Sequence, residues 1–287
     1  MPPLLPRHFL IASLALLTAG GISVDARAAE RSTFLAQADN PFNSLVGKRR
    51  EKSKERRQQA GAVERYVLAG DGRIFLFEER GATARVRFLC EADDQRIDCA
   101  LDDTAPSPEI YQLNAIRGPR GDVIYKNAQG ETLLRIAAYG GATVFWPGEI
   151  QGTAASKSFG DDHTLSLVFE DRQVATMRAQ SAAAHISAKT GAPILFDISA
   201  APRASGSNSA VLADAVLTAA KGIARVAKDP TGARVIAARI KKVAFAPGKT
   251  ANVRLDGAVL VIVYVPNLDI DGRPSSSEIA YFLEESL

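Results

Sequence analysis

Cysteine and histidine are scarce in this sequence, and both shortages limit its chemistry. The 287 residues include two cysteines, three histidines and one tryptophan. A cysteine-rich zinc fold, an iron–sulfur cluster or a multi-disulfide scaffold needs more of these side chains than the chain supplies. The sequence therefore excludes all three classes.

Two nucleophile motifs are missing as well. No serine is followed by a lysine three positions later, as serine β-lactamases require, and no serine stands in a Gly-x-Ser-x-Gly frame. Lys189-Thr190-Gly191 matches one part of the β-lactamase pattern, but without the serine it is interpreted as the end of a helix. The sequence thus contains no complete catalytic constellation.

A long hydrophobic run is also absent, and the apolar stretch near the N-terminus is short. Arg7 and His8 precede about 16 apolar residues at 9–24, and Ala26-Arg27-Ala28 follows as a small-x-small cleavage site. A membrane-spanning helix needs roughly 20 such residues. We therefore expect residues 1–28 to be a secretory signal peptide and the mature protein to be periplasmic or secreted and not transmembrane. A retained membrane anchor is the alternative.

Positive charge is concentrated in one segment. The formal charge of +3 falls to +2 when signal cleavage removes Arg7, Arg27 and Asp25, whereas residues 48–58 alone carry seven basic and two acidic side chains. So small an overall excess predicts no nucleic-acid binding. Residues 29–62 have no apolar stripe, so we expect a flexible basic arm that attracts an envelope component or anionic lipid. A merely solubilising linker is the alternative.

Residues 63–152 have the pattern of an antiparallel β domain. Short β-rich runs alternate with turn residues about every ten positions. Arg85 and Arg87 alternate with Val86 and Phe88, as in a half-buried strand. The expected strands are 66–69, 73–77, 84–90, 96–101, 109–115, 122–126, 131–139 and 142–146. These runs predict a meander that closes into a small barrel or sandwich.

Residues 153–287 predict an α+β domain, after a polar bridge over 149–162. Helices are expected at 168–189, 209–228, 230–240 and 278–287, and strands at 193–198, 242–246, 251–255 and 258–265. The strand at 258–265 is apolar enough to be a central one. The chain is therefore assigned to the α+β class, with an antiparallel β meander followed by a mixed α/β half.

The two cysteines flank a predicted turn at Asp94-Gln95. A two-residue turn there places Cys90 and Cys99 directly opposite each other on a hairpin. Export would supply the oxidising compartment in which disulfides persist. The sequence thus predicts a disulfide between Cys90 and Cys99.

Asp161, Asp162 and His163 form the one group in which carboxylates and an imidazole are adjacent. Such a group is able to relay protons or to bind a metal ion. An ordinary solvated loop is the competing interpretation. The two interpretations differ in whether the three side chains converge in a cleft.

The loop at 267–278 carries the spacing of a calcium loop. Oxygen donors occupy positions 1, 3, 5 and 12, namely Asn267, Asp269, Asp271 and Glu278. Asparagine at position 1, Pro274 and a preceding strand depart from that pattern. The alternative is a polar turn whose serines at 275–277 cap the last helix. We expect this structural role, with any calcium bound only weakly, and no other cofactor.

Four short words in the sequence resemble a known family. They are Pro-Arg-Gly-Asp-Val-Ile-Tyr-Lys-Asn at 119–127, Gly-Glu-Thr-Leu-Leu-Arg at 130–135, Gly-Gly-Ala-Thr-Val-Phe at 140–145 and Gly-Arg-Pro-Ser-Ser at 272–276. The words resemble a family of secreted alphaproteobacterial proteins known as a domain of unknown function. The resemblance implies export and a shared fold from about residue 63 to the end, and it transfers no catalytic residue.

These features favour a non-catalytic module of the periplasm or envelope with a binding or structural role. The export signal, the two packed halves and the lack of a complete catalytic constellation support this interpretation. The alternative is a periplasmic hydrolase that uses Asp161, Asp162 and His163 at the junction of the halves.

Overall fold

The computed structural model describes residues 61–89, 109–147, 149–160, 165–201 and 209–287. These residues form an eight-stranded antiparallel barrel followed by an α+β half with four α-helices. The α+β class is confirmed, and a barrel is the form that the β region takes. The signal peptide, the basic arm up to residue 60, Cys90 and Cys99, and Asp161, Asp162 and His163 lie outside the described residues.

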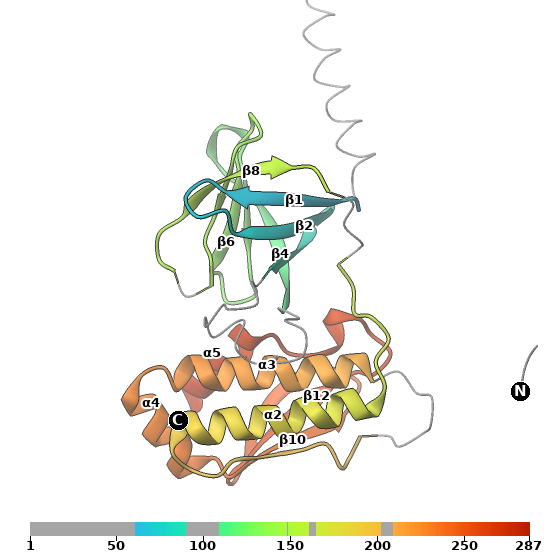
Figure 1. The fold of residues 1–287 in the computed structure, drawn as a ribbon, viewed down its shortest axis with the longest axis vertical. Coiled ribbons are helices and arrows are strands. Elements are labelled where there is room, and N and C mark those ends of the chain that lie inside the picture. The colour runs from blue at the N-terminus through green and yellow to red at the C-terminus, as the bar shows by residue number, and fades with distance from the viewer. Residues whose placement is uncertain (1–60, 90–108, 148, 161–164, 202–208) are drawn as a thin grey trace, which may run out of the picture. The chain divides into compact units, whose positions relative to one another are not determined.

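The barrel is a meander in which each strand pairs antiparallel with the next (Figure 1). Its strands are β1 (Val63–Leu68), β2 (Ile74–Arg80), β3 (Thr83–Phe88), β4 (Ile110–Arg117), β5 (Val123–Lys126), β6 (Thr132–Ile136), β7 (Ala142–Val144) and β8 (Thr153–Ser158). A 3-10 turn, η1 (Pro119–Gly121), precedes β5. β8 pairs with both β7 and β1, so the barrel is closed.

β8 occupies part of the segment that the sequence predicts to be a polar bridge. Its sequence, Thr-Ala-Ala-Ser-Lys-Ser, buries only Ala155 and has no apolar alternation. Its backbone groups instead decide its conformation, because they complete the hydrogen bonding of the neighbouring strand edges. The barrel therefore reaches Ser158, beyond the expected end at residue 152. The strand expected at 96–101 lies outside the described residues, and β3 pairs directly with β4.

Aromatic rings fill the barrel interior. Tyr66 stacks on Phe75 with ring centroids 5.0 Å apart, and Phe88 lies 4.7 Å from Trp146. Phe88 and Val86 point into this core, as the alternation predicts. Arg85, on the other face of β3, is also buried rather than exposed. The reason is that the α+β half covers this outer face of the barrel through a second apolar cluster, formed by Leu76, Ile110, Leu165 and Ile270.

The α+β half is built on a four-stranded sheet with the order β11-β12-β10-β9. Its elements are α2 (Arg172–Thr190), β9 (Leu195–Asp197), α3 (Ala210–Val226), α4 (Pro230–Arg239), β10 (Lys242–Pro247), β11 (Asn252–Asp256), β12 (Val259–Tyr264), the 3-10 turn η2 (Ile270–Gly272) and α5 (Ser276–Ser286). β10 runs parallel to β9 and β12, and β11 is antiparallel to β12. β12 is thus an internal strand, as its apolar sequence predicts.

α3 is the central helix of this half, with 15 of its 17 residues buried. It lies beside α2 and also packs against α5 (Figure 1). Gly222 makes the approach to α5 close, because a Cβ there would lie 2.8 Å from Cβ of Ile279. Among the described helices, none is both long enough and apolar enough to cross a bilayer.

A buried ionic cluster joins the two halves. Nε of Arg273 donates to the Asp214 carboxylate on α3 at 2.5 Å, and its Nη2 donates to the carbonyl of Ile110 at 3.0 Å. Glu109, just before β4, accepts a hydrogen bond from the backbone N–H of Ser276 at 3.0 Å. Because buried charges are costly unless they are paired, this cluster fixes the start of α5 against both β4 and α3.

Candidate functional site

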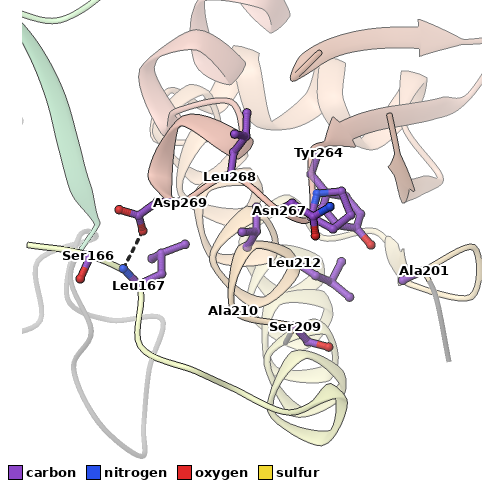
Figure 2. A pocket seen from close by; sticks show the side chains of 12 residues that line it. Ser166, Leu167, Ala201, Ser209, Ala210, Leu212, Tyr264, Asn267, Leu268 and Asp269 are labelled. Atoms are coloured by element: carbon purple, nitrogen blue, oxygen red, sulfur yellow. Dashed lines mark hydrogen bonds between the residues drawn. The ribbon is translucent and has the colours of Figure 1, made fainter. Parts of the chain in front are cut away.

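A cavity of about 670 Å³ lies at the carboxyl end of β12, next to the first turn of α3 (Figure 2). Ligands of α/β proteins characteristically bind beyond the carboxyl ends of parallel strands. Most of the described wall is apolar or uncharged. It consists of Ser166, Leu167, Ala201, Ser209, Ala210, Val211, Leu212, Tyr264, Pro266, Asn267, Leu268 and Asp269.

Asp269 holds one wall of the cavity in place. Its Oδ1 accepts a hydrogen bond from the backbone N–H of Leu167 at 2.8 Å, drawn as the dashed line in Figure 2. Its Oδ2 accepts from Nη1 of Arg85 at 2.5 Å, and the same nitrogen donates to the carbonyl of Leu165 at 2.6 Å. The segment at 165–167 is therefore fastened both to the barrel and to the loop after β12.

Arg172 fixes the opposite wall. Its guanidinium donates to the carbonyl of Ile198 at 3.0 Å and to the carbonyl of Ala201 at 2.9 Å. These bonds tie the chain after β9 to the start of α2. Burial raises the pKa of Tyr264, and the positive charge of Arg172 counteracts only part of that rise. The phenol at this end of β12 therefore remains neutral near pH 7.

The first turn of α3 forms the floor. The backbone N–H of Ser209 donates to the carbonyl of Glu170 at 2.8 Å, and its carbonyl accepts from Ala213 at 2.9 Å. This arrangement brings the N-terminal end of a 17-residue helix to the cavity. The positive end of its dipole favours a ligand oxygen with partial negative charge.

The described lining contains few titratable side chains. Asp269 and Tyr264 are its only titratable side chains. Asp269 already accepts from a guanidinium and a backbone amide, and Tyr264 holds its proton. A general base must have an acceptor directed at the substrate, whereas both carboxylate oxygens of Asp269 accept hydrogen bonds from the protein itself.

The structure brings together two of the four predicted calcium ligands. Asp269 contacts Nη1 of Arg85, and Oδ2 of Asp271 lies 3.7 Å from Nη2 of the same side chain. The Arg85 guanidinium thus lies beside the two carboxylates and neutralises their charge, as a bound calcium ion does in a calcium loop. No cluster of three or more His, Cys, Asp or Glu residues suited to a metal ion occurs within the described part of the chain.

The other two predicted ligands have different roles. Asn267 is exposed at the rim of the cavity. Glu278 belongs to a capping box, because its carboxylate accepts from the Ser275 N–H at 2.7 Å while its own N–H donates to the Ser275 hydroxyl at 3.1 Å. The cap predicted for the serines is therefore present at Ser275, and α5 begins two residues earlier than expected. The hydrolase candidates Asp161, Asp162 and His163 remain predictions, because they lie outside the described residues.

Sequence reasoning missed the cavity itself. Arg85, Arg172 and Tyr264 position or line it, yet none stands in a motif. The partners of the two arginines lie 26 and 29 residues away for Arg172 and 184 residues away for Arg85 and Asp269. One feature of the sequence pointed to the cavity. The apolar run at 258–265 predicts a central strand, and Pro266 and Asn267 follow its carboxyl end, where α/β proteins often bind ligands.

Comparison with known proteins gives one match. The model of the family described as Domain of unknown function (DUF4908) matches residues 41–283. No curated protein and no solved structure shows significant similarity to the chain. The match covers the whole barrel and nearly all of the α+β half, and it includes both the Arg273 cluster and the cavity beside α3. The chain therefore belongs to the DUF4908 family, a domain of unknown function.

Proposed function

We propose that this protein is an exported, non-catalytic module that binds a small, uncharged and partly apolar ligand in the cavity beside α3. The observation that carries the proposal is the 670 Å³ cavity at the carboxyl end of β12, whose described lining has no directed acid, base or nucleophile. Its volume falls in the range of roughly 300–1,000 Å³ that is typical of small-molecule sites. Export is supported by the signal-peptide pattern at residues 1–28.

The lining defines the ligand's chemistry. Leu167, Val211 and Leu212 offer apolar surface, and hydroxyl or amide groups come from Ser209, Tyr264 and Asn267. The single carboxylate is already paired with Arg85. An ionic ligand would therefore find no uncompensated charge of opposite sign, whereas a neutral molecule with an oxygen acceptor would match both the apolar wall and the N-terminal end of α3.

The proposal is tested with Nile red, an uncharged apolar dye that fluoresces strongly when it leaves water. We expect residues 29–287 to bind the dye with micromolar affinity. Asn267→Trp places a large ring at the exposed rim of the cavity and should weaken binding about tenfold or more, because it occupies ligand space with little cost to folding. Asn114→Trp changes a matched exposed asparagine on the barrel and should bind the dye like the unmodified protein.

Equal dye binding by the two tryptophan variants would place the apolar site elsewhere and contradict the proposal. An absence of binding to the unmodified protein would contradict it as well. Circular dichroism spectra of both variants, recorded beside that of the unmodified chain, establish that each is folded.

A further inference from the structure

The end of the barrel opposite α3 is formed by two turns and the strand ends beside them. At the end that meets α3, Glu131 pairs with Arg225 of that helix. The opposite end carries the turn between β4 and β5 at 118–122 and the turn between β6 and β7 at 137–141. β8 ends and β1 begins there as well, as the pairing of these two strands shows. We call the two turns and the adjoining strand ends the barrel tip.

Hydrogen bonds of one carboxylate hold the two turns side by side. Oδ1 of Asp122, in the first turn, accepts from the backbone N–H of Ala138, in the second turn, at 3.2 Å. Oδ2 of Asp122 accepts from Nε of Arg135 at 2.9 Å. The hydrogen bond from Arg135 lowers the pKa of Asp122 below its usual value, so this carboxylate is ionised near neutral pH and keeps both bonds. The two turns are therefore fixed relative to each other.

Arg120 stands in the first turn in an unfavourable backbone conformation. Its φ is 62°, and within the described part of the chain it is the one residue other than glycine with a positive φ. Gly121 follows with a φ of 84°, and the N–H of Asp122 closes the turn on the carbonyl of Pro119 at 3.3 Å. Two central residues with positive φ make a type I′ turn, whose first central position usually carries asparagine, aspartate or glycine. An arginine at this position costs conformational energy, which is typical of functional sites.

The barrel tip presents positive charge and aromatic surface together. Arg117 and Arg120 are exposed, and the one carboxylate within the two turns, Asp122, is already paired. Tyr139 is 90% exposed in the second turn, and Phe159, which follows β8, is fully exposed. Exposed rings are unfavourable in water, whereas aromatic side chains are enriched at the interface between a membrane and water.

The other charges near the barrel tip do not cancel this positive charge. Glu64 pairs with Lys157 at 2.7 Å. Glu79 is half-buried and lines a small cavity in the barrel mouth, so it offsets at most one of the two exposed arginines. The chain also enters β1 at this end, and the basic segment at 48–58 precedes β1 in the sequence. The connection to the barrel tip therefore brings further positive charge.

From these features we propose that the barrel tip binds the surface of an anionic lipid bilayer. Arg117 and Arg120 contact lipid phosphate groups, and the rings of Tyr139 and Phe159 enter the interfacial layer. A soluble polyanion would attract the arginines but would offer the rings no apolar region, so a bilayer fits both features. The proposal does not depend on the site for an uncharged ligand beside α3.

Cosedimentation with lipid vesicles tests the proposal. Residues 29–287 are mixed with phosphatidylcholine vesicles that contain about one third phosphatidylglycerol, at about 0.1 M salt. We expect the protein to sediment with these vesicles and to bind vesicles of pure phosphatidylcholine about tenfold more weakly or worse, because the latter have no net charge.

Arg120→Asn separates membrane binding from folding. Asparagine suits the type I′ turn, so the midpoint of thermal unfolding should rise by about 1–3 °C. Binding to the anionic vesicles should nevertheless weaken about fivefold, as expected for one positive charge lost near a membrane surface. Arg254→Asn removes an exposed arginine from β11, outside the barrel tip, and should bind the vesicles like the unmodified chain.

Tyr139→Ser tests the aromatic contribution. It removes an exposed ring without changing the charge, and it should weaken binding to the anionic vesicles about threefold. Tyr281→Ser changes an exposed tyrosine on α5 and is the matched control, which should leave binding unchanged. Circular dichroism spectra establish that all four variants are folded.

Several results would overturn the proposal. They are no sedimentation with anionic vesicles at about 1 mM lipid, equal binding to the two kinds of vesicle, and unchanged binding in both Arg120→Asn and Tyr139→Ser. Equal losses in Arg120→Asn and Arg254→Asn would show that net charge alone matters. Binding to soluble polyphosphate as tight as to vesicles, weakened by Arg120→Asn but not by Tyr139→Ser, would identify a soluble polyanion as the partner instead.

Discussion

The barrel core and the central helix α3 of the α+β half differ in the side chains that they bury. Large rings fill the barrel, including Phe75, Phe77 and Trp146, and several of them contact one another. Alanines dominate α3, where Ala215, Ala219 and Ala220 are buried among neighbouring helices. The barrel interior is a space that large groups fill, whereas α3 approaches α5 closely at a residue without a side chain, Gly222. The two halves should therefore be sensitive to opposite changes of side-chain volume.

The largest effect is expected when a ring is removed from the barrel. Phe75 is fully buried and lies between Tyr66 and Phe88, so Phe75→Ala would leave a cavity that the closed barrel cannot collapse. We expect a loss of about 3–5 kcal/mol in the free energy of unfolding, measured by urea denaturation. Ile116→Ala, at a position that is 47% exposed on the same barrel, should cost below about 1 kcal/mol. Similar losses of unfolding free energy in the two variants would contradict the view that the barrel depends on its large buried rings.

Two spectroscopic probes make this test specific to each half. Trp146 is the only tryptophan in the chain and belongs to the barrel core, so its fluorescence reports on the barrel. Far-UV circular dichroism reports mainly on the helices of the α+β half. Because the Arg273 cluster joins the halves, we expect the two signals to change at the same urea concentration. Separate transitions would show that the halves unfold independently.

A smaller effect is expected when volume is added between the helices. In Gly222→Ala the new methyl group would lie 2.8 Å from both Ile279 and the carbonyl of Ser276, so α3 and α5 must move apart. Alanine is the better helix former by about 0.5–1 kcal/mol, yet we expect a net loss of about 1–3 kcal/mol in the same denaturation experiment. Gln180→Ala, at an exposed position on α2, is the matched control and should stay within about 0.5 kcal/mol. A gain in stability for Gly222→Ala would contradict close packing at this site.

The same contrast explains which elements were predictable from the sequence. β2 begins with a run of aromatic and branched residues at 74–77, and in β3 the apolar residues Val86 and Phe88 alternate with arginines, so both strands are visible in the sequence. α3 is apolar over five turns, and β12 is apolar throughout. β8 was missed because it buries one alanine and owes its place to backbone pairing with β1. Periodicity reports burial of side chains, and it is silent where only the backbone specifies a strand.

The sites were less predictable than the elements because they depend on contacts between distant residues. Asp214 and Lys221 are charged residues within the apolar helix α3, and that anomaly could be noticed in the sequence. The residues around them could not be predicted. Arg273, which binds Asp214, lies 59 residues away, and Trp146, which lines the same cavity as Lys221, belongs to the barrel. The spacing of Asn267, Asp269, Asp271 and Glu278 was visible, but Arg85, which contacts two of them, is a barrel residue without any motif.

The smallest effect concerns the loop that contacts both halves, between β12 and α5. Calcium must compete there with the Arg85 guanidinium for Asp269, and Glu278 must leave its capping box to become a ligand. We therefore expect calorimetry to show either no binding or a Kd of roughly 10⁻⁴ to 10⁻³ M, which limits stabilisation by 1 mM calcium to about 1.4 kcal/mol. Magnesium is the control ion, since its stricter octahedral geometry suits this loop still less. Micromolar calcium binding that is abolished by Asp269→Ala together with Glu278→Gln would overturn the structural role of the loop. It would mean that calcium displaces Arg85 from Asp269.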